Sequence, residues 1–295
     1  MEKINTSTNS PKQPLWGPAG NSISFSQKGY KNNLDIPKYL AEFGLTAFEY
    51  QCGRGVRISE ESAQKFGVVC ATAGIALSIH APYYISMSSV ELEKRDNSIN
   101  YILQSAKAAR AMGADRIILH TGSCGKITRE HALDLAKGTM KNAIFAMDDN
   151  GYADIAICPE TMGKINQLGT LSEVIELCTL DERLIPCIDF GHLNARTFGG
   201  IKTIADYEAI LDEIEDKLGY DRLKIFHSHF SKIEFTEKGG EKRHLTFKDE
   251  FYGPKFEPLA ELVAKKALTP RFICESDGTQ AEDAQTMMSA YKSFL

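Results

Sequence analysis

The chain has 295 residues, of which 43% are hydrophobic and 25% are charged. This composition is ordinary for a globular protein with a sizeable core, and it excludes the disordered and fibrous classes. The net charge is -5 at pH 7 and the pI is near 5.9, so no overall positive charge attracts nucleic acid or anionic lipid. A nucleic-acid substrate would therefore require local basic groups or metal ions.

The sequence shows no membrane or export signal. No run of about 18 apolar residues is present, and the start MEKINTSTNSPKQP lacks the apolar centre of a signal peptide. We expect residues 1–14 to form a mobile tail and 15–295 to form one domain. The seven cysteines include no CxxC pair, and Cys158, Cys187 and Cys274 lie in apolar runs, where a free thiol acts as a small apolar side chain. Reduced thiols predict a cytoplasmic protein. The lack of a long apolar run and of positive net charge predicts no membrane partner.

The chain repeats a short apolar run followed by a longer amphipathic segment. A first strand is expected near 15–20, with a helix at 35–43. Further strands are expected at 46–51, 76–81, 116–122, 154–160, 184–190, 223–229 and 271–276. Helical spacing of apolar residues predicts helices at 59–73, 89–112, 128–149, 171–179, 203–218, 256–267 and 281–294. Eight such units predict a parallel sheet covered by helices and indicate an α/β fold of the (β/α)₈ TIM barrel type. A doubly wound open sheet is the alternative.

Histidines and carboxylates gather where the predicted strands end. The histidines at or just after these ends are His80, His120, His192, His227, His229 and His244. Only His131 lies inside a predicted helix, where we expect a surface position. Glu160, Asp189 and Glu275 also close strands. In a barrel, the carboxyl ends of all strands converge on one mouth, where active sites are built.

Each of these residues alone has a structural explanation. A histidine that closes a strand can be hydrogen-bonded locally, and an aspartate or glutamate can cap the next helix. Crowded together at one mouth, the groups would repel one another or lack partners unless cations held them. Neutral imidazole and carboxylate suit Zn²⁺, Mn²⁺ or Fe²⁺. The number of groups is sufficient for two or three ions, and clustered ions of this kind serve phosphoryl chemistry.

Six motifs in chain order resemble the endonuclease IV family (AP endonuclease family 2), within the xylose isomerase-like TIM barrel superfamily. They are SIHAPY, ILHTGS, CPETMG, CIDFGH, FHSHFSK and ICESDGTQ. Members of that family are trinuclear zinc barrels. The resemblance implies a metal-dependent hydrolase of DNA repair. A metal-bridging hydroxide would cleave damaged DNA 5′ to an abasic site.

The resemblance also implies a ligand for each of three ions. The first ion would be surrounded by Glu160, Asp189, His227 and Glu275, the second by Glu160, His80 and His120, and the third by His192 with His244 or other groups of the loop after strand seven. Glu160 and Glu275 are the expected catalytic residues.

Two features depart from the endonuclease IV pattern. The nuclease has an Asp-x-His pair in the loop after strand seven, whereas this chain has Lys242 in place of the aspartate, with Glu241 before it. His229 stands where the family has asparagine. We therefore expect His229 or Glu241 to replace the missing carboxylate.

Substrate contacts are expected from two loops. The family inserts loop residues into DNA to expose the abasic sugar. Tyr83 of SIHAPY and Arg54 of QCGRGVR occupy such loops, although Tyr83 could instead pack at the barrel rim.

Two alternative functions remain at this point. Sugar isomerases and epimerases of the same superfamily use one divalent metal in a Glu, Asp, His, Glu quartet, with the two glutamates as paired acid and base. They do not need His80 and His120. The other alternative is a non-catalytic paralogue that binds metal or damaged DNA.

Overall fold

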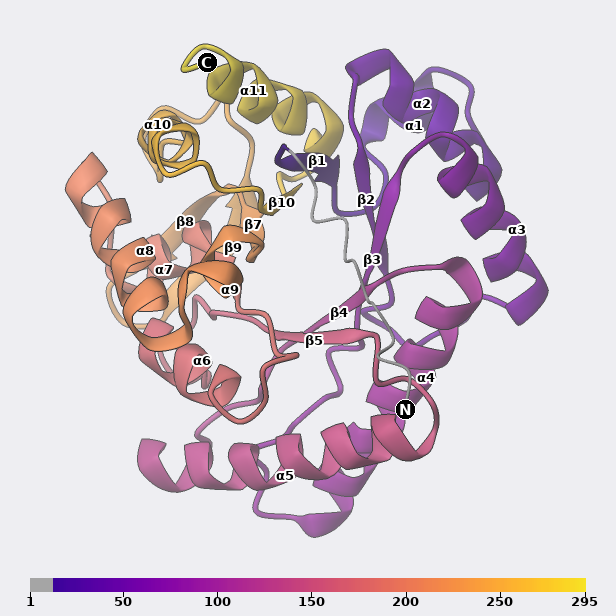
Figure 1. Ribbon diagram of the computed structural model, residues 1–295. Coiled ribbons are helices and arrows are strands. Elements are labelled where there is room, and N and C mark those ends of the chain that lie inside the picture. The colour runs from indigo at the N-terminus through magenta and orange to yellow at the C-terminus, as the bar shows by residue number, and fades with distance from the viewer. Residues whose placement is uncertain (1–12) are drawn as a thin grey trace, which may run out of the picture.

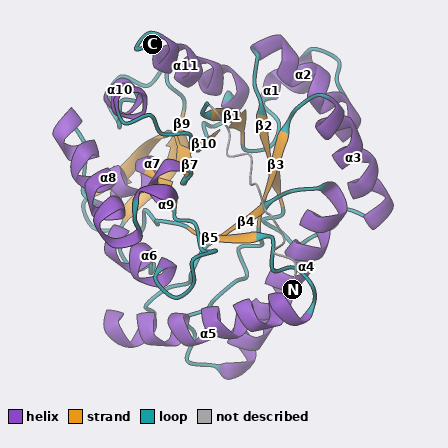
Figure 2. Ribbon diagram, viewed as in Figure 1, coloured by secondary structure: helices purple, strands orange, loops and turns teal. Residues whose placement is uncertain are grey.

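The computed structural model describes residues 13–295 (Figure 1). The tail was expected at 1–14, and its residues 1–12 lie outside the described residues. The remainder forms a ring of parallel strands surrounded by helices (Figure 2), which confirms the (β/α)₈ TIM barrel. The barrel strands are β1 (Leu15–Pro18), β2 (Ala47–Gln51), β3 (Ala76–His80), β4 (Arg116–Leu119), β5 (Ala156–Pro159), β6 (Cys187–Asp189), β7 (His227–Phe230) and β10 (Arg271–Cys274).

The barrel closes through two four-stranded parallel sheets. One has the order β1-β10-β7-β6 and the other β2-β3-β4-β5. Single parallel bridges join them, from Ala19 to Glu49 beside β1 and β2, and from Glu160 to Cys187 beside β5 and β6. Because all strands run the same way, their carboxyl ends meet at one mouth.

The helices form the outer layer. They are α1 (Ile23–Gln27), α2 (Ile36–Phe43), α3 (Glu60–Thr72), α4 (Leu92–Met112), α5 (Arg129–Asp149), α6 (Leu171–Cys178), α7 (Phe190–Arg196), α8 (Ile204–Leu218), α9 (Tyr220–Lys224), α10 (Glu257–Lys265) and α11 (Gln280–Lys292), with a 3₁₀ turn η1 (Asn33–Asp35). Local signals fix their ends: Ser59 and Thr128 cap α3 and α5 by accepting main-chain N–H groups, and Gly113 ends α4 at φ 72°. No helix within residues 13–295 combines the length and apolarity needed to span a bilayer.

The amino ends of the strands are closed by a charged cluster. Arg271, which is 4% exposed, donates to both carboxylate oxygens of Asp115 at 2.8 and 3.0 Å and to the carbonyl of Leu77 at 2.9 Å. Arg116 lies against the same aspartate. Apolar side chains fill the space between strands and helices, as where Trp16 stacks on Phe272. All seven cysteines are free and buried.

Strand seven differs from its expected range. The prediction at 223–229 was wrong at its start, because Leu223 and Lys224 belong to α9 and the strand begins at His227. Gly219, at φ 84°, starts that helical turn. After β7 the chain forms an antiparallel hairpin, β8 (Lys232–Thr236) and β9 (Gly240–Leu245), where only a loop was expected. The hairpin brings β9 to the mouth of the barrel.

Candidate metal centre

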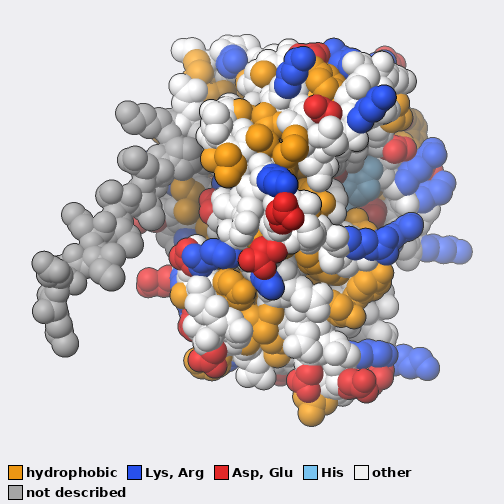
Figure 3. All heavy atoms as spheres, turned by 90° about the vertical axis from the view of Figure 1, so that its right-hand side faces the viewer, with side chains coloured by type: hydrophobic (Ala, Val, Ile, Leu, Met, Phe, Trp, Pro, Cys, Tyr) orange, Lys and Arg blue, Asp and Glu red, His pale blue; other side chains and the backbone are white. Residues whose placement is uncertain are grey.

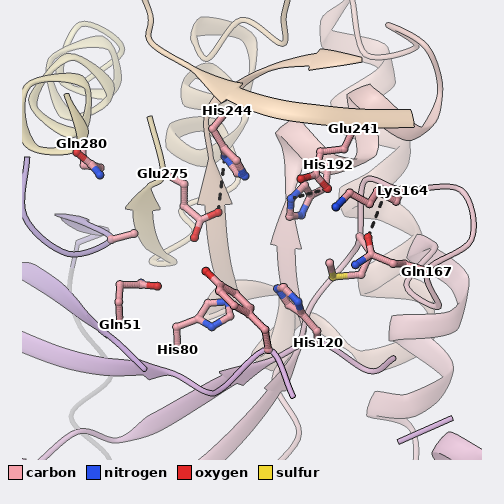
Figure 4. Close-up of a pocket in the computed structure, with 13 residues that line it drawn as sticks. Gln51, His80, His120, Lys164, Gln167, His192, Glu241, His244, Glu275 and Gln280 are labelled. Atoms are coloured by element: carbon pink, nitrogen blue, oxygen red, sulfur yellow. Dashed lines mark hydrogen bonds and ion pairs between the residues drawn. The ribbon is translucent and has the colours of Figure 1, made fainter. Parts of the chain in front are cut away.

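A cavity of about 520 Å³ opens at the carboxyl ends of the strands. Figure 4 shows imidazole, carboxylate and amide side chains from opposite sides of the barrel pointing into it. It is lined by Ala19, Gln51, His80, Tyr83, His120, Met162, Lys164, Gln167, His192, Glu241, His244, Glu275 and Gln280. Expected site residues and several unexpected ones, such as Gln51, Lys164 and Gln280, therefore share one space.

Four groups from four strand ends converge at the floor of this cavity. They are Glu160, Asp189, His229 and Glu275, and one ligand atom of each lies within 4.8 Å of the others. His229 Nδ1 is 3.1 Å from Glu160 Oε1 and 3.6 Å from Glu275 Oε1. We call these four residues the quartet. Three of them are fully buried, and Glu275 is the member that lines the cavity.

A second group adjoins the quartet through Glu160. His80 Nε2 and His120 Nε2 lie 3.4 and 3.3 Å from Glu160 Oε2. His80 Nδ1 lies 2.9 Å from the carbonyl of Ala81, which fixes Nδ1 as the protonated nitrogen and leaves the Nε2 lone pair toward Glu160. Glu160 thus faces both groups, one with each oxygen.

A third group lies between α7 and the hairpin. It consists of His192, Glu241 and His244. His192 Nε2 is 3.5 Å from Glu241 Oε2, while its Nδ1 is 2.9 Å from the carbonyl of Thr161. His244 Nδ1 is 2.8 Å from Ser231 Oγ. Lys242 stands where the nuclease motif has an aspartate, and Glu241 lies beside His192 and His244 in its place. The pairing register of the hairpin shifts at a bulge between Glu234 and Phe235, which accounts for this position of Glu241.

The donor set fits divalent cations. Glu160 Oε2 and Asp189 Oδ2 are buried oxygens with no hydrogen-bond partner, a costly arrangement that a cation would relieve. Asp189 Oδ1 already accepts the N–H of His192 at 2.8 Å and caps α7, so its other oxygen is the one free for a ligand role. Burial raises the pKa of Asp189, whereas nearby His229 and His120 outweigh burial and hold the pKa of Glu160 well below its usual range. Imidazole with carboxylate suits Zn²⁺, Mn²⁺ or Fe²⁺.

The structure does not bring His227 into the quartet. Strand β7 pairs with β6 so that His229 lies opposite Asp189 and His227 opposite Cys187, two residues deeper in the barrel. Both imidazoles point inward, as expected from strand alternation, but His229 is the one level with the carboxylates. Burial lowers the pKa of His227 to about 3, so this side chain is neutral at physiological pH.

Sequence reasoning missed Glu49 on β2. Its carboxylate is fully buried inside the barrel and lies 3.0 Å from His227 Nε2 and 2.9 Å from His229 Nε2. The available signal was a carboxylate in the middle of the apolar run TAFEYQ, since a buried glutamate requires partners. The inward-facing position places it below the quartet.

The two expected substrate-binding residues differ in position. The Tyr83 ring lines the cavity and stacks on His120, with ring centroids 5.4 Å apart. Although it contacts the rim, 59% of its surface is exposed, so it remains accessible to a ligand. Arg54 is exposed but is not among the residues that line the cavity.

The family model described as xylose isomerase-like TIM barrel matches residues 37–293. The chain belongs to this family.

Its relatives include several proteins named for endonuclease IV. An uncharacterized protein of Methanocaldococcus jannaschii, MJ0133, is 31% identical over 94% of this chain and 96% of its own length. A protein named probable endonuclease 4 from Listeria welshimeri is 30% identical over 76% of each chain. These matches confirm the resemblance to endonuclease IV within the xylose isomerase-like family.

Solved structures show the same fold. Endonuclease IV from Thermus thermophilus has a TM-score of 0.67 at 17% identity and covers 95% of this chain and 98% of its own. A D-tagatose 3-epimerase-like protein has a TM-score of 0.69 at 16% identity, over 95% and 97% of the two chains. Backbone similarity therefore does not separate nuclease from epimerase, and side chains must carry the functional argument.

Proposed function

We propose that this member of the family is a metal-dependent phosphodiester hydrolase of the endonuclease IV kind, which cleaves DNA 5′ to abasic sites. The observation that carries the proposal is the presence of three adjoining ligand groups at one mouth, two of which share Glu160. Two or three ions, with Zn²⁺ as the proposed metal, would be held by the quartet, by His80 and His120 with Glu160, and by His192, Glu241 and His244. His227 is not included among these ligands.

The bound ions would supply Lewis acidity toward phosphoryl oxygens and lower the pKa of a water molecule. The chain's own residues would orient the reacting groups. Glu275 is the quartet member that lines the cavity, and its carboxylate is placed to accept a proton from a water in that cavity. Glu160 is buried at the centre and would fix the separation of the two groups that it faces.

The surroundings of the cavity suit an anionic substrate despite the net charge of -5. Lys164 lines the cavity. Figure 3 shows Lys and Arg side chains around a recess in which a histidine is visible. Exposed basic residues on loops include Arg54, Arg57, Lys126 and Lys238. On the hairpin, Lys242 and Arg243 are also exposed, and both pair with Glu234. A local positive rim attracts phosphates even when the protein as a whole is acidic.

The deciding experiment is incubation of zinc-loaded protein with a duplex that contains one abasic site, with and without chelator. We expect a nick 5′ to the site that chelator abolishes. His120→Ala should abolish nicking, whereas His131→Ala, an exposed change on α5, should leave it unchanged. Fully metallated protein that fails to nick the duplex would refute the proposal. Retained binding of abasic duplex would then favour the non-catalytic paralogue.

The quartet by itself supports a second candidate, a sugar epimerase with one metal and Glu160 and Glu275 as its acid and base. That function leaves His80, His120 and the third group without a role. Metal analysis separates the two candidates, because one Mn²⁺ per chain together with turnover of ketoses would favour the epimerase, and two or three zinc ions would exclude it.

A further inference from the structure

Glu49 lies directly beneath the quartet, and both of its oxygens are in contact with buried polar groups. Its Oε1 is 2.9 Å from His229 Nε2 and accepts a hydrogen bond from Gln51 Nε2 at 3.2 Å. Its Oε2 accepts from Ser78 Oγ at 2.9 Å and lies 3.0 Å from His227 Nε2. Contacts on both oxygens leave this carboxylate little freedom to turn.

The contact with Glu49 determines which nitrogen of His229 faces the quartet. A carboxylate only accepts hydrogen bonds, so the hydrogen between the two groups belongs to His229 Nε2. His229 Nδ1 also faces carboxylates, at 3.1 Å from Glu160 Oε1 and 3.6 Å from Glu275 Oε1. A cation held by the quartet would take the lone pair of Nδ1, and the ring proton would then remain on Nε2 against Glu49. This arrangement turns the metal-binding nitrogen toward the carboxylates of the quartet.

Two other buried imidazoles, His80 and His192, use main-chain groups for the same purpose. His80 and His192 each place Nδ1 at 2.9 Å from a carbonyl oxygen and direct Nε2 into the cluster. His229 is reversed, with Nε2 outward from the quartet and a carboxylate as its partner. A carboxylate in this position also increases the basicity of the imidazole as a metal ligand.

We infer that Glu49 is a positioning residue that holds His229 as the Nε2–H tautomer, with Nδ1 directed at the quartet. The inference rests on the metal centre of the proposed function but is independent of the substrate. Glu49 touches neither the cavity nor, in this arrangement, an ion.

A purely structural role for Glu49 makes a different prediction. His227 contacts the same carboxylate but lies outside the quartet. If Glu49 only provides a polar partner for buried imidazoles, replacing His227 and replacing Glu49 should have equal effects on metal binding. If Glu49 orients His229, only the Glu49 change should weaken metal binding.

The experiment uses full-length protein and zinc, with chelator competition as the affinity measurement. Glu49→Ala should bind the quartet ion 10- to 100-fold more weakly, about the loss measured for outer partners of metal-bound histidines. Glu49→Gln should restore most of the affinity, because its amide oxygen can accept from His229 Nε2. The control His227→Gln should lower the melting temperature while zinc affinity stays near the native value.

Nitrogen-15 NMR of the zinc-loaded native protein tests the tautomer directly, with His229→Asn used to assign the signals. We expect a proton on Nε2 and none on Nδ1. A proton on Nδ1 would overturn the inference, as would native zinc affinity in a folded Glu49→Ala protein. If Glu49→Ala does not fold, the NMR spectrum of the native protein and the zinc affinity of Glu49→Gln still test the inference. Failure to nick DNA, with these results unchanged, would refute the proposed substrate only.

Discussion

His229 on β7 lies opposite Asp189 on β6, and this register pair places one imidazole and one carboxylate at the same height in the barrel. We therefore predict that His229→Ala loses one bound ion and that His227→Ala retains it. The affinity loss should exceed about 100-fold, because removing a ligand costs more than removing its outer partner. Metal analysis after dialysis against zinc checks both variants. Loss of the ion from His227→Ala alone would reverse the assignment.

Gly163 separates the third ligand group from β5. A Cβ at this position would lie 2.6 Å from Glu241 Cβ and 3.0 Å from His192 Cδ2, so Gly163→Ala must displace the hairpin. We expect this variant to bind one ion fewer than the native protein. The matched control is Gly138→Ala on α5, where a Cβ meets nothing within 4 Å and helix propensity favours alanine by about 1 kcal/mol. Unchanged metal content in Gly163→Ala would show that the hairpin contributes no metal ligand.

Metal removal should lower thermal stability. The buried oxygens of Glu160 and Asp189 that lack partners would lose their cation. A ligand at a free concentration about 1,000 times its Kd stabilises by about 4 kcal/mol, which corresponds to a shift on the order of 10 °C. Calorimetry with and without chelator measures this shift. In His229→Ala the shift should be clearly smaller, and an equal shift in that variant would show that the stabilising ion is bound elsewhere.

Tyr83 is predicted to contact substrate with its ring. Tyr83→Ala should raise KM for an abasic duplex roughly tenfold, since stacking on an aromatic ring contributes about 1–3 kcal/mol, and Tyr83→Phe should stay near native. The metal content should not change. Tyr84→Ala provides the control, because Tyr84 is similarly exposed but packs beside Tyr101. Equal effects of the two alanine variants would argue for loop disruption instead.

The charged cluster at the opposite end of the barrel gives a pH prediction. Arg271 and Arg116 outweigh the partial desolvation of Asp115 and lower the pKa of its carboxyl, although 54% of this side chain is exposed. The stabilisation is thus present above the unfolded-state pKa of about 3.9 and is lost as the pH falls toward the lower folded-state value.

At pH 7, Asp115→Asn should cost about 1 kcal/mol of unfolding free energy, because solvent screens a carboxylate that is 54% exposed. Urea unfolding measures this cost, which should shrink as the pH falls below about 3.9. Asp154→Asn, which removes an exposed ion pair with Arg110, should cost less. A constant difference across pH would exclude the ionic explanation.

The fold could be predicted from the sequence because nearly continuous apolar strands alternate with amphipathic helices. Helix α3, expected at 59–73, spans Glu60–Thr72, since Ser59 is a local cap. Strand β7 was harder to predict, because LKIF is apolar enough for a strand yet its first two residues complete a helical turn after Gly219. Local pattern did not distinguish these two outcomes.

The types of residue at the candidate site could be predicted from the sequence, but their height in the barrel could not. Motif order indicated which strand ends carry candidate metal ligands, and strand alternation indicated that His227 and His229 share a face. Neither signal gives the height of a residue in the barrel, which depends on the register between β6 and β7. The contribution of Glu241 depended on a hairpin bulge, and Glu49 on contacts with residues about 180 positions away.

The shared carboxylate beneath the quartet also constrains how this sequence can evolve. Loss of Glu49 alone would leave two buried imidazoles without their shared partner. Loss of either histidine alone would remove one partner from the buried Glu49 carboxylate. Substitutions at positions 49 and 227 should thus be individually deleterious but mutually compensating, whereas no change at position 49 should compensate for loss of the proposed ligand His229. In an alignment of relatives, we expect positions 49 and 227 to covary, with an apolar residue at the first accompanied by replacement of the second.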